Sequence, residues 1–183
     1  MPATSDTAGT GGDPGADAEP PPRLSLEVIH DDGDWSAFPD VETAIRRCAA
    51  GIETHGNLIA GSAQACVALS SADVVRRLNR EYRQKDKPTN VLSFPALDAA
   101  PAGFAGGAQS LGDVILAAEV VLAEAAENGV PPLHHLQHLV VHGLLHLMGY
   151  DHETDAQAAI MEGLETDILQ QLGIADPYSQ DLA

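Results

Sequence analysis

The stretch HGLLHLMGYDH, residues 142–152, predicts a helix that ends in a turn and brings three histidines together. His142 and His146 are four residues apart. On an α-helix such a step turns a side chain by about 40° and lifts it by about 6 Å, so the two rings share one face. Gly149 predicts the end of the helix, because glycine readily takes the left-handed backbone of a helix stop. The chain can then turn back and bring His152 to the same face.

These three histidines form a set of nitrogen donors that leaves one coordination position open. Imidazoles at i and i+4 converge at a Zn–N distance of about 2.0–2.1 Å, and three protein ligands with an open fourth position are typical of a catalytic zinc site. The sequence therefore predicts one Zn²⁺ per chain on His142, His146 and His152. His138, one turn earlier, either supports a ligand or is a partly buried polar residue. Asp151 either orients a ligand or stabilises the turn.

The residue after the first histidine is Gly143, where zinc peptidases with the H-E-x-x-H pattern have a glutamate. That glutamate accepts a proton from the metal-bound water and passes it to the leaving amine of the peptide. Because glycine cannot carry this proton, Gly143 argues against peptide hydrolysis. An RNA phosphodiester brings its own 2′-hydroxyl, and its cleavage chiefly needs neutralisation of the charge that develops on the phosphate. His134 and His135, at the start of the same helix, are expected to face solvent.

The charge of the chain is unevenly distributed. The net charge is −18, yet the segment 71–95 holds six of the nine Lys and Arg residues and only three acids, so it carries +3 and the remainder −21. This pattern predicts a polyanion that is bound at one place and repelled elsewhere, although a solvated basic helix face is the simpler alternative. The six basic residues are Arg76, Arg77, Arg80, Arg83, Lys85 and Lys87.

Composition predicts one folded domain between two tails. Residues 1–22 are rich in Pro, Gly, Ala and Asp without apolar periodicity, which is typical of a disordered tail; residues 23–178 form the domain and 179–183 a C-terminal tail. No signal peptide or membrane-spanning run is recognised, so we expect a cytoplasmic protein without a membrane partner. Cys48 and Cys66 are then expected to be small apolar groups and not a disulfide.

Apolar periodicity and turn residues predict an α+β fold, with a single mixed sheet of about four strands packed by helices. The first helix is expected to stop near Gly51, and Ser71 or Asp73 to cap the second, whose apolar face includes Tyr82. Residues 97–110 are expected to form a flexible loop. In chain order, the expected elements are strand 23–32, helix 40–52, strand 64–71, helix 72–83, strands 90–96 and 111–117, and helices 118–129, 133–149 and 154–173.

HGLLHLMGYDH, together with YRQKDKPTNVLSFP and LGDVILA upstream, resembles the YbeY family of single-strand-specific metallo-endoribonucleases, the rRNA maturation factors. The resemblance spans roughly residues 24–178. It implies a fold distantly similar to zinc metalloproteases, one zinc on the three histidines, and a role in 16S rRNA 3′-end maturation and ribosome quality control. It also implies a functional arginine, which corresponds to Arg83. The long N-terminal tail and the 97–110 loop depart from the family pattern. This departure leaves open which partners the chain contacts, but it does not affect the histidine motif.

We hypothesise that zinc polarises the scissile phosphate while the forked guanidinium of Arg83 holds its oxygens. Lys85, Lys87, Arg80 and Arg76 would bind the strand of rRNA, and the acidic remainder could meet proteins of the small ribosomal subunit. Two alternatives stay open: a non-catalytic ribosome-assembly factor in which zinc only stabilises the structure, and a zinc peptidase.

Several neighbouring residues have two interpretations each. Tyr82 could stack on a base, although its spacing favours core packing. Thr89, Asn90 and Ser93 either bind sugar and phosphate or serve turn and strand chemistry.

Overall fold

Four strands form one mixed sheet in the computed structural model, which describes residues 22–56, 58–96 and 108–179. The strand order is β1-β2-β4-β3, in which β1, β2 and β4 are parallel and the edge strand β3 is antiparallel to β4. The strands alternate buried and exposed residues because one sheet face meets the core and much of the other meets water. Their bounds are β1 Leu24–His30, β2 Ala63–Ser70, β3 Val91–Pro95 and β4 Gln109–Ala117.

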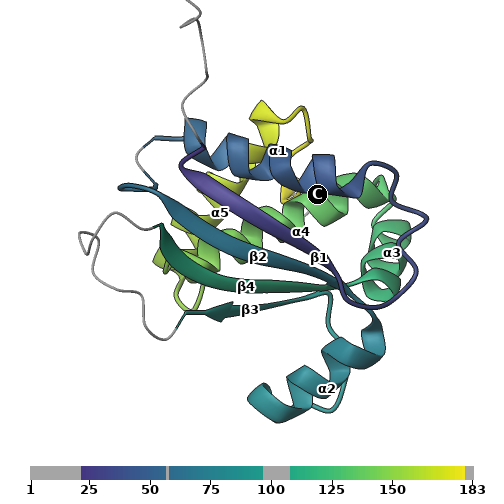
Figure 1. Ribbon diagram of the computed structural model, residues 1–183. Coiled ribbons are helices and arrows are strands. Elements are labelled where there is room, and N and C mark those ends of the chain that lie inside the picture. The colour runs from purple at the N-terminus through teal and green to yellow at the C-terminus, as the bar shows by residue number, and fades with distance from the viewer. Residues whose placement is uncertain (1–21, 57, 97–107, 180–183) are drawn as a thin grey trace, which may run out of the picture.

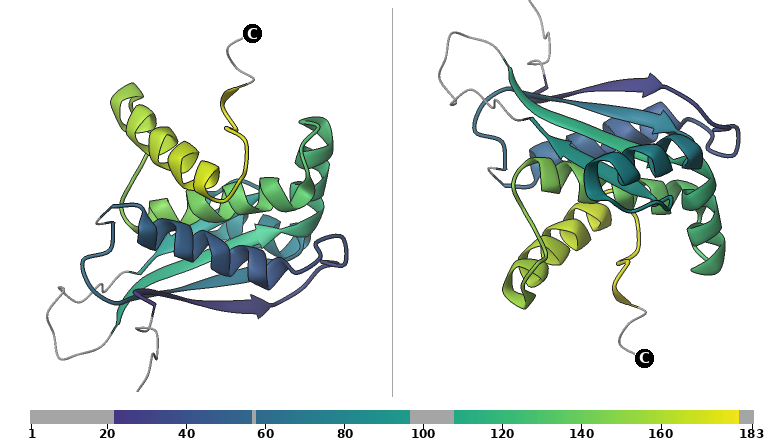
Figure 2. Two further views of the ribbon diagram at one scale, coloured as in Figure 1. Left: turned by 90° about the horizontal axis from the view of Figure 1, so that it is seen from above. Right: turned by 90° about the horizontal axis from the view of Figure 1, so that it is seen from below.

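Five helices surround this sheet. Helices α1 and α4 lie side by side over one face of the sheet, and α5 packs across them on their outer side (Figures 1 and 2). Helix α4 is apolar around most of its circumference because it is enclosed between the sheet and the other helices. The bounds are α1 Val41–Thr54, α2 Ala72–Arg83, α3 Ala118–Glu127, α4 Pro132–Leu147 and α5 Asp155–Gln171.

Two groups of buried residues stabilise this arrangement. The larger one fills the space between the sheet and α1, α4 and α5, and includes Leu26, Val67, Val114, Leu144 and Ile168. The smaller one places Val75 of α2 against Leu92 and Ala117, at one end of the sheet. The predicted α+β class and the predicted order of elements along the chain are both confirmed.

Two details of the predicted elements are wrong. Helix α1 does not stop near Gly51 but continues to Thr54. The glycine serves packing there: a side chain at position 51 would meet Ile168 and Leu172, so its absence allows α5 to approach. Strand β4 begins at Gln109, inside the expected loop. Residues 97–107 of that loop, residues 1–21 of the N-terminal tail and residues 180–183 of the C-terminal tail lie outside the described residues.

Helix α2 also departs from expectation at its end. Ser71 is the N-cap, with its Oγ accepting a hydrogen bond from the Val74 N–H at 3.3 Å. Tyr82, however, is not in the core: it is 63 % exposed and packs edge-on against Phe94 of β3, with ring centroids 5.2 Å apart. The smaller buried group meets α2 through Val75 and Leu78, in the first two turns of the helix, whereas Tyr82 in the last turn reaches water.

The predicted free thiols are confirmed. Cys48 is fully buried, Cys66 is partly exposed, and both are free thiols. None of the helices in the described ranges combines the length and the apolar character that crossing a bilayer would require.

Candidate metal centre

The three histidines of the opening stretch come together in the structure. His142 and His146 lie in the last two turns of α4, and His152 lies in the connection to α5. One ring nitrogen from each lies within 4.8 Å of the others, and the Nε2 atoms of His142 and His146 are 3.0 Å apart. His152 is exposed and the other two are half-buried, so the cluster opens to solvent on one side.

The turn that brings His152 back is built by the backbone. Gly149 has φ +91°, and the N–H groups of Gly149 and Tyr150 donate to the carbonyl oxygens of His146 and Leu145 at 3.0 and 3.1 Å. This is the helix stop expected from glycine. Asp151 accepts the backbone N–H of His152 at 2.8 Å, which is the turn-stabilising role that the sequence left open.

Hydrogen bonds at the Nδ1 atoms fix the tautomers of both α4 ligand candidates. His142 Nδ1 lies 2.8 Å from Glu165 Oε1, and His146 Nδ1 lies 3.0 Å from the carbonyl oxygen of Tyr150. Because a carboxylate and a carbonyl only accept, each neutral ring carries its hydrogen on Nδ1 and a lone pair on Nε2. In the neutral rings the two Nε2 lone pairs therefore face each other across 3.0 Å, an arrangement that a metal ion or a shared proton between them stabilises.

This donor set fits a zinc ion. Two Zn–N bonds of about 2.0–2.1 Å at a tetrahedral angle place their nitrogens about 3.4 Å apart, close to the observed separation of the Nε2 atoms. Burial, followed by repulsion from His142, lowers the pKa of His146 and keeps its ring neutral, as a metal ligand must be.

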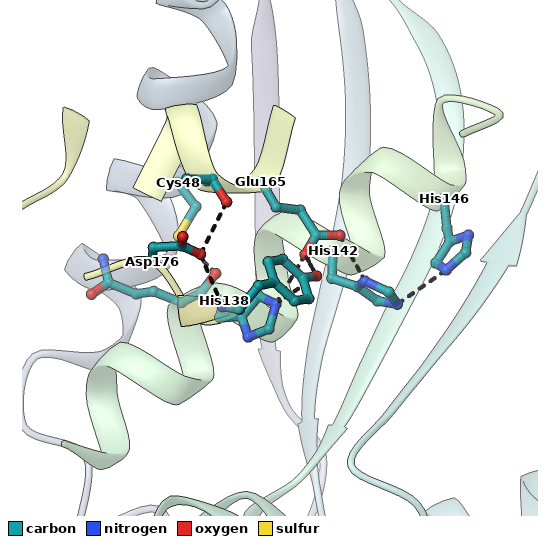
Figure 3. Close-up of polar contacts among 9 residues, drawn as sticks. Cys48, His138, His142, His146, Glu165 and Asp176 are labelled. Atoms are coloured by element: carbon teal, nitrogen blue, oxygen red, sulfur yellow. Dashed lines mark hydrogen bonds and ion pairs between the residues drawn. The ribbon is translucent and has the colours of Figure 1, made fainter. Parts of the chain in front are cut away.

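Glu165 is the functional residue that sequence reasoning missed. It projects from α5 with no exposed surface, and its two oxygens bridge His142 Nδ1 at 2.8 Å and His138 Nε2 at 2.9 Å (Figure 3). Burial alone would raise its pKa, but hydrogen bonds from His138, His142 and Tyr178 outweigh burial and lower the pKa to about 2. The carboxylate therefore stays charged and orients the ring of His142.

A sequence signal for Glu165 did exist. The buried positions of α5 are Met161, Glu165, Ile168 and Leu169, which form one stripe at helical spacing. A charged residue on an otherwise apolar stripe needs a partner, because an isolated buried charge is too costly.

His138 lies near the cluster without joining it. Its Nε2 is bonded to Glu165, and its ring centroid is 6.4 Å from that of His142. Tyr178 also donates its hydroxyl to Glu165, and burial together with that carboxylate raises the pKa of Tyr178, so the phenol remains a donor. His138 is thus linked to His142 through Glu165, as expected if it supports a ligand.

Gly143 packs directly against the sheet. A Cβ at this position would lie 2.8 Å from Val114 Cγ1 and 3.1 Å from Ser93 Oγ, and Ser93 Oγ donates to the Gly143 carbonyl at 3.3 Å. A glutamate therefore has no space where zinc peptidases place theirs.

The basic segment makes its ion pairs within itself. Arg76 forms a two-point ion pair with Asp86 at 2.9 and 3.2 Å, and Arg80 lies 3.9 Å from the same carboxylate. Arg83 ends α2 and, like Lys85 and Lys87, is exposed; in the described ranges none of these three forms an ion pair, and no hydrogen bond joins the segment to the histidine cluster.

Three neighbouring polar residues serve the structure. The Asn90 side chain donates a hydrogen bond to Glu124, and Thr89 Oγ1 lies 3.5 Å from Asn90 Oδ1. Ser93 Oγ donates to the Gly143 carbonyl of α4. His135 does not face solvent as expected: its side chain is 11 % exposed and its Nε2 lies 2.8 Å from Glu124.

Comparison with known proteins gives consistent matches. The family model described as Endoribonuclease YbeY matches residues 36–173. The chain is 48 % identical over 157 residues to the Endoribonuclease YbeY of Azorhizobium caulinodans, which covers 85 % of this chain and 97 % of that protein. It is 45 % identical to that of Parvibaculum lavamentivorans, covering 86 % of each chain. The solution structure of TM1509 from Thermotoga maritima matches with a TM-score of 0.47 and 21 % identity, covering 83 % of this chain and 97 % of that one.

Proposed function

The chain belongs to the YbeY family of endoribonucleases, hydrolases that act on RNA, and on this basis we propose that it is a zinc-dependent enzyme specific for single strands. The observation that carries the proposal is the convergence of three imidazoles with an exposed side. His142, His146 and His152 would hold the metal. Bound zinc supplies a Lewis acid that can polarise a phosphoryl oxygen.

Residues of the chain prepare this site for a phosphate. Glu165 and the Tyr150 carbonyl hold the Nδ1 hydrogens of His142 and His146, so that both Nε2 lone pairs are directed to the shared space. Arg83 is proposed to hold two oxygens of the scissile phosphate through its fork and to offset the charge that develops there. Its exposure at the end of α2 leaves the guanidinium accessible.

Neighbouring residues would guide the RNA strand. Lys85 and Lys87 are exposed beside Arg83, whereas Arg76 and Arg80 share Asp86 and would have to exchange that carboxylate for a phosphate. The exposed ring of Tyr82, supported by Phe94, can stack on an unpaired base, which favours single strands.

We further propose that the substrate is 16S rRNA near its 3′ end, in the cytoplasm and on the small ribosomal subunit. The residues outside segment 71–95 carry −21, which would repel RNA elsewhere and favour contacts with basic ribosome-associated proteins.

Gly143 disfavours a zinc peptidase, because the packing at Val114 leaves no room for a proton-carrying side chain. A zinc staple in a non-catalytic assembly factor makes a different prediction: a metal-site variant that keeps its fold but cannot cleave would still support normal 3′-end formation.

Single-turnover cleavage of a structured rRNA fragment tests the proposal, with zinc content measured in the same preparation. Arg83→Ala should cleave at least 100-fold more slowly and keep its zinc, by analogy with the loss of one charge-stabilising donor. His142→Ala should lose both zinc and cleavage. Arg47→Ala, an exposed arginine on α1, is the matched control and should cleave normally. Undiminished cleavage by zinc-free His142→Ala would overturn the metal mechanism.

A further inference from the structure

Two adjoining cavities lie beside the metal centre, where α3 ends and α4 begins. The cavity nearer the histidine cluster, called the inner cavity, has a volume of about 340 Å³ and is lined in part by His142. The outer cavity, of about 420 Å³, is bounded by the C-terminal segment 174–179, which passes over α4 between α5 and α3 (Figure 2, left). Both are lined by Asn128, His135, His138 and Tyr178, so together they form one recess that reaches the candidate metal ligand. Its size is that of a site for a small organic group.

A chain of hydrogen bonds forms one wall of the inner cavity. Asn90 Nδ2 donates to Glu124 Oε2 at 2.9 Å, and His135 Nε2 lies 2.8 Å from the same oxygen. Asn90 is itself held, because its Oδ1 accepts the Val91 N–H at 2.7 Å. The carboxylate of Glu124 therefore has a fixed orientation, set by Asn90, which precedes β3, on one side and by His135 of α4 on the other.

Glu124 and His135 keep hydrogen-bonding capacity for a ligand. Both recorded bonds to Glu124 end on Oε2, which leaves Oε1 without a partner among the residues that the structure describes. Because His135 donates through Nε2, its Nδ1 carries a lone pair in the neutral ring. The inner cavity thus presents acceptors and a negative charge. A phosphate would be repelled there, whereas a neutral hydrogen-bond donor would be bound.

We propose that the inner cavity binds the nucleoside part of the nucleotide adjacent to the cleaved bond, with Glu124 Oε1 accepting a hydrogen bond from it. This rests on the proposed function, in which the scissile phosphate lies at His142, His146 and Arg83. The donor is a hydroxyl of the ribose or an amine of the base, and both are groups by which proteins recognise RNA. His135 and Asn90 are positioning residues that hold the carboxylate.

The hydrogen bonds of Glu124 with Asn90 and His135 could also serve the fold alone. The Glu124→Gln variant distinguishes this structural role from a role in ligand binding. The amide can turn its oxygen towards Asn90 and His135 and keep both inward bonds. It then presents an NH₂ donor in place of the free acceptor. The variant should therefore keep the melting temperature and zinc content of the wild-type holoenzyme and lose only ligand binding. Glu127→Gln is the control: it makes the same charge change on the same helix, at an exposed position outside the recess.

The experiment measures dissociation constants for short fluorescent single strands, by anisotropy on ice before cleavage accumulates. Oligoadenylate and oligouridylate are each used with ribose and with 2′-deoxyribose. Glu124→Gln should weaken binding of oligoribonucleotides by about tenfold or more, and Glu127→Gln should not. If the donor is the ribose hydroxyl, both ribose strands weaken and both deoxyribose strands do not. If it is the base amine, both oligoadenylates weaken and the oligouridylates do not.

Equal binding by Glu124→Gln and Glu127→Gln to every strand, while the wild type still binds and cleaves RNA, would overturn the subsite and leave the proposed function intact. Conversely, selective weakening in Glu124→Gln together with undiminished cleavage by zinc-free His142→Ala would support the subsite and contradict the metal mechanism. A wild-type chain that binds none of the strands would contradict both.

Discussion

Replacement of Gly143 by alanine tests the closest contact between α4 and the sheet. The added Cβ would lie 2.8 and 3.1 Å from the two methyl groups of Val114 and 3.1 Å from Ser93 Oγ. Val114 cannot retreat, because it is fully buried on β4 and paired with Val67 of β2 on one side and Ser93 of β3 on the other. Overpacking of this kind costs about 1–3 kcal/mol, whereas Gly→Ala in a helix interior gains about 1 kcal/mol. We expect a net loss of up to about 2 kcal/mol.

Gly163→Ala is the matched control for helix propensity. Gly163 lies inside α5, is exposed, and an added Cβ would meet nothing within 4 Å. This variant should gain about 0.5–1 kcal/mol, so that the difference between the two variants isolates the contact with Val114 at about 1–3 kcal/mol.

The assay is urea and thermal unfolding followed by circular dichroism, on zinc-loaded and on chelated protein. For a chain of this size, 1 kcal/mol moves the melting temperature by about 2–4 °C. Gly143→Ala should melt below the wild type and Gly163→Ala above it. A Gly143→Ala protein as stable as Gly163→Ala would refute the close approach of α4 to the sheet, and with it the steric explanation for the missing glutamate.

Three further outcomes are expected. Glu165→Gln should weaken zinc binding by about 10–100-fold in a chelator competition, since the residue orients His142, while Asp167→Asn on the exposed side of α5 should not. Arg83→Lys should recover only part of the cleavage rate lost in Arg83→Ala, as measured in single turnover, because lysine keeps the charge but not the fork. Burial raises the pKa of Cys48 to about 12, so its thiol should resist iodoacetamide in the folded protein and react after unfolding, as followed by mass spectrometry. The same shift makes the free energy of unfolding depend on pH: its contribution is complete below pH 9.0 and is lost as the pH rises from 9.0 to about 12.

Local patterns were sufficient where the structure depends on neighbours in sequence. The spacing of His142 and His146 and the stop at Gly149 involve one helix and one turn, and both were predictable. The stop expected at Gly51 was wrong because α1 continues against α5, a contact between residues more than 100 positions apart. Tyr82 has core spacing on its helix, yet it meets the sheet edge-on at Phe94 and stays 63 % exposed. Only the tertiary arrangement determines whether an apolar stripe is covered.

Glu165 shows the same limit at the site itself. Its bond to His142 spans 23 residues and exists because α5 crosses α4 at that point. The sequence contains the anomaly of an acid on an apolar stripe, but several histidines could have been its partner. The bridge to both His138 and His142 follows from the crossing of the two helices, which periodicity does not define.

The absence of a side chain at position 143 and the direction of the His142 ring have one structural cause. Successive residues of a helix are about 100° apart, so the contact of Gly143 with Val114 and Ser93 turns His142 away from the sheet and towards α5. There the ring meets the one carboxylate buried on α5, which fixes its hydrogen on Nδ1 and directs Nε2 to His146. A bulkier residue at 143 would therefore displace the helix and turn the His142 ring away from His146. The glycine that leaves no room for a glutamate at this position thus also allows the two Nε2 atoms to converge.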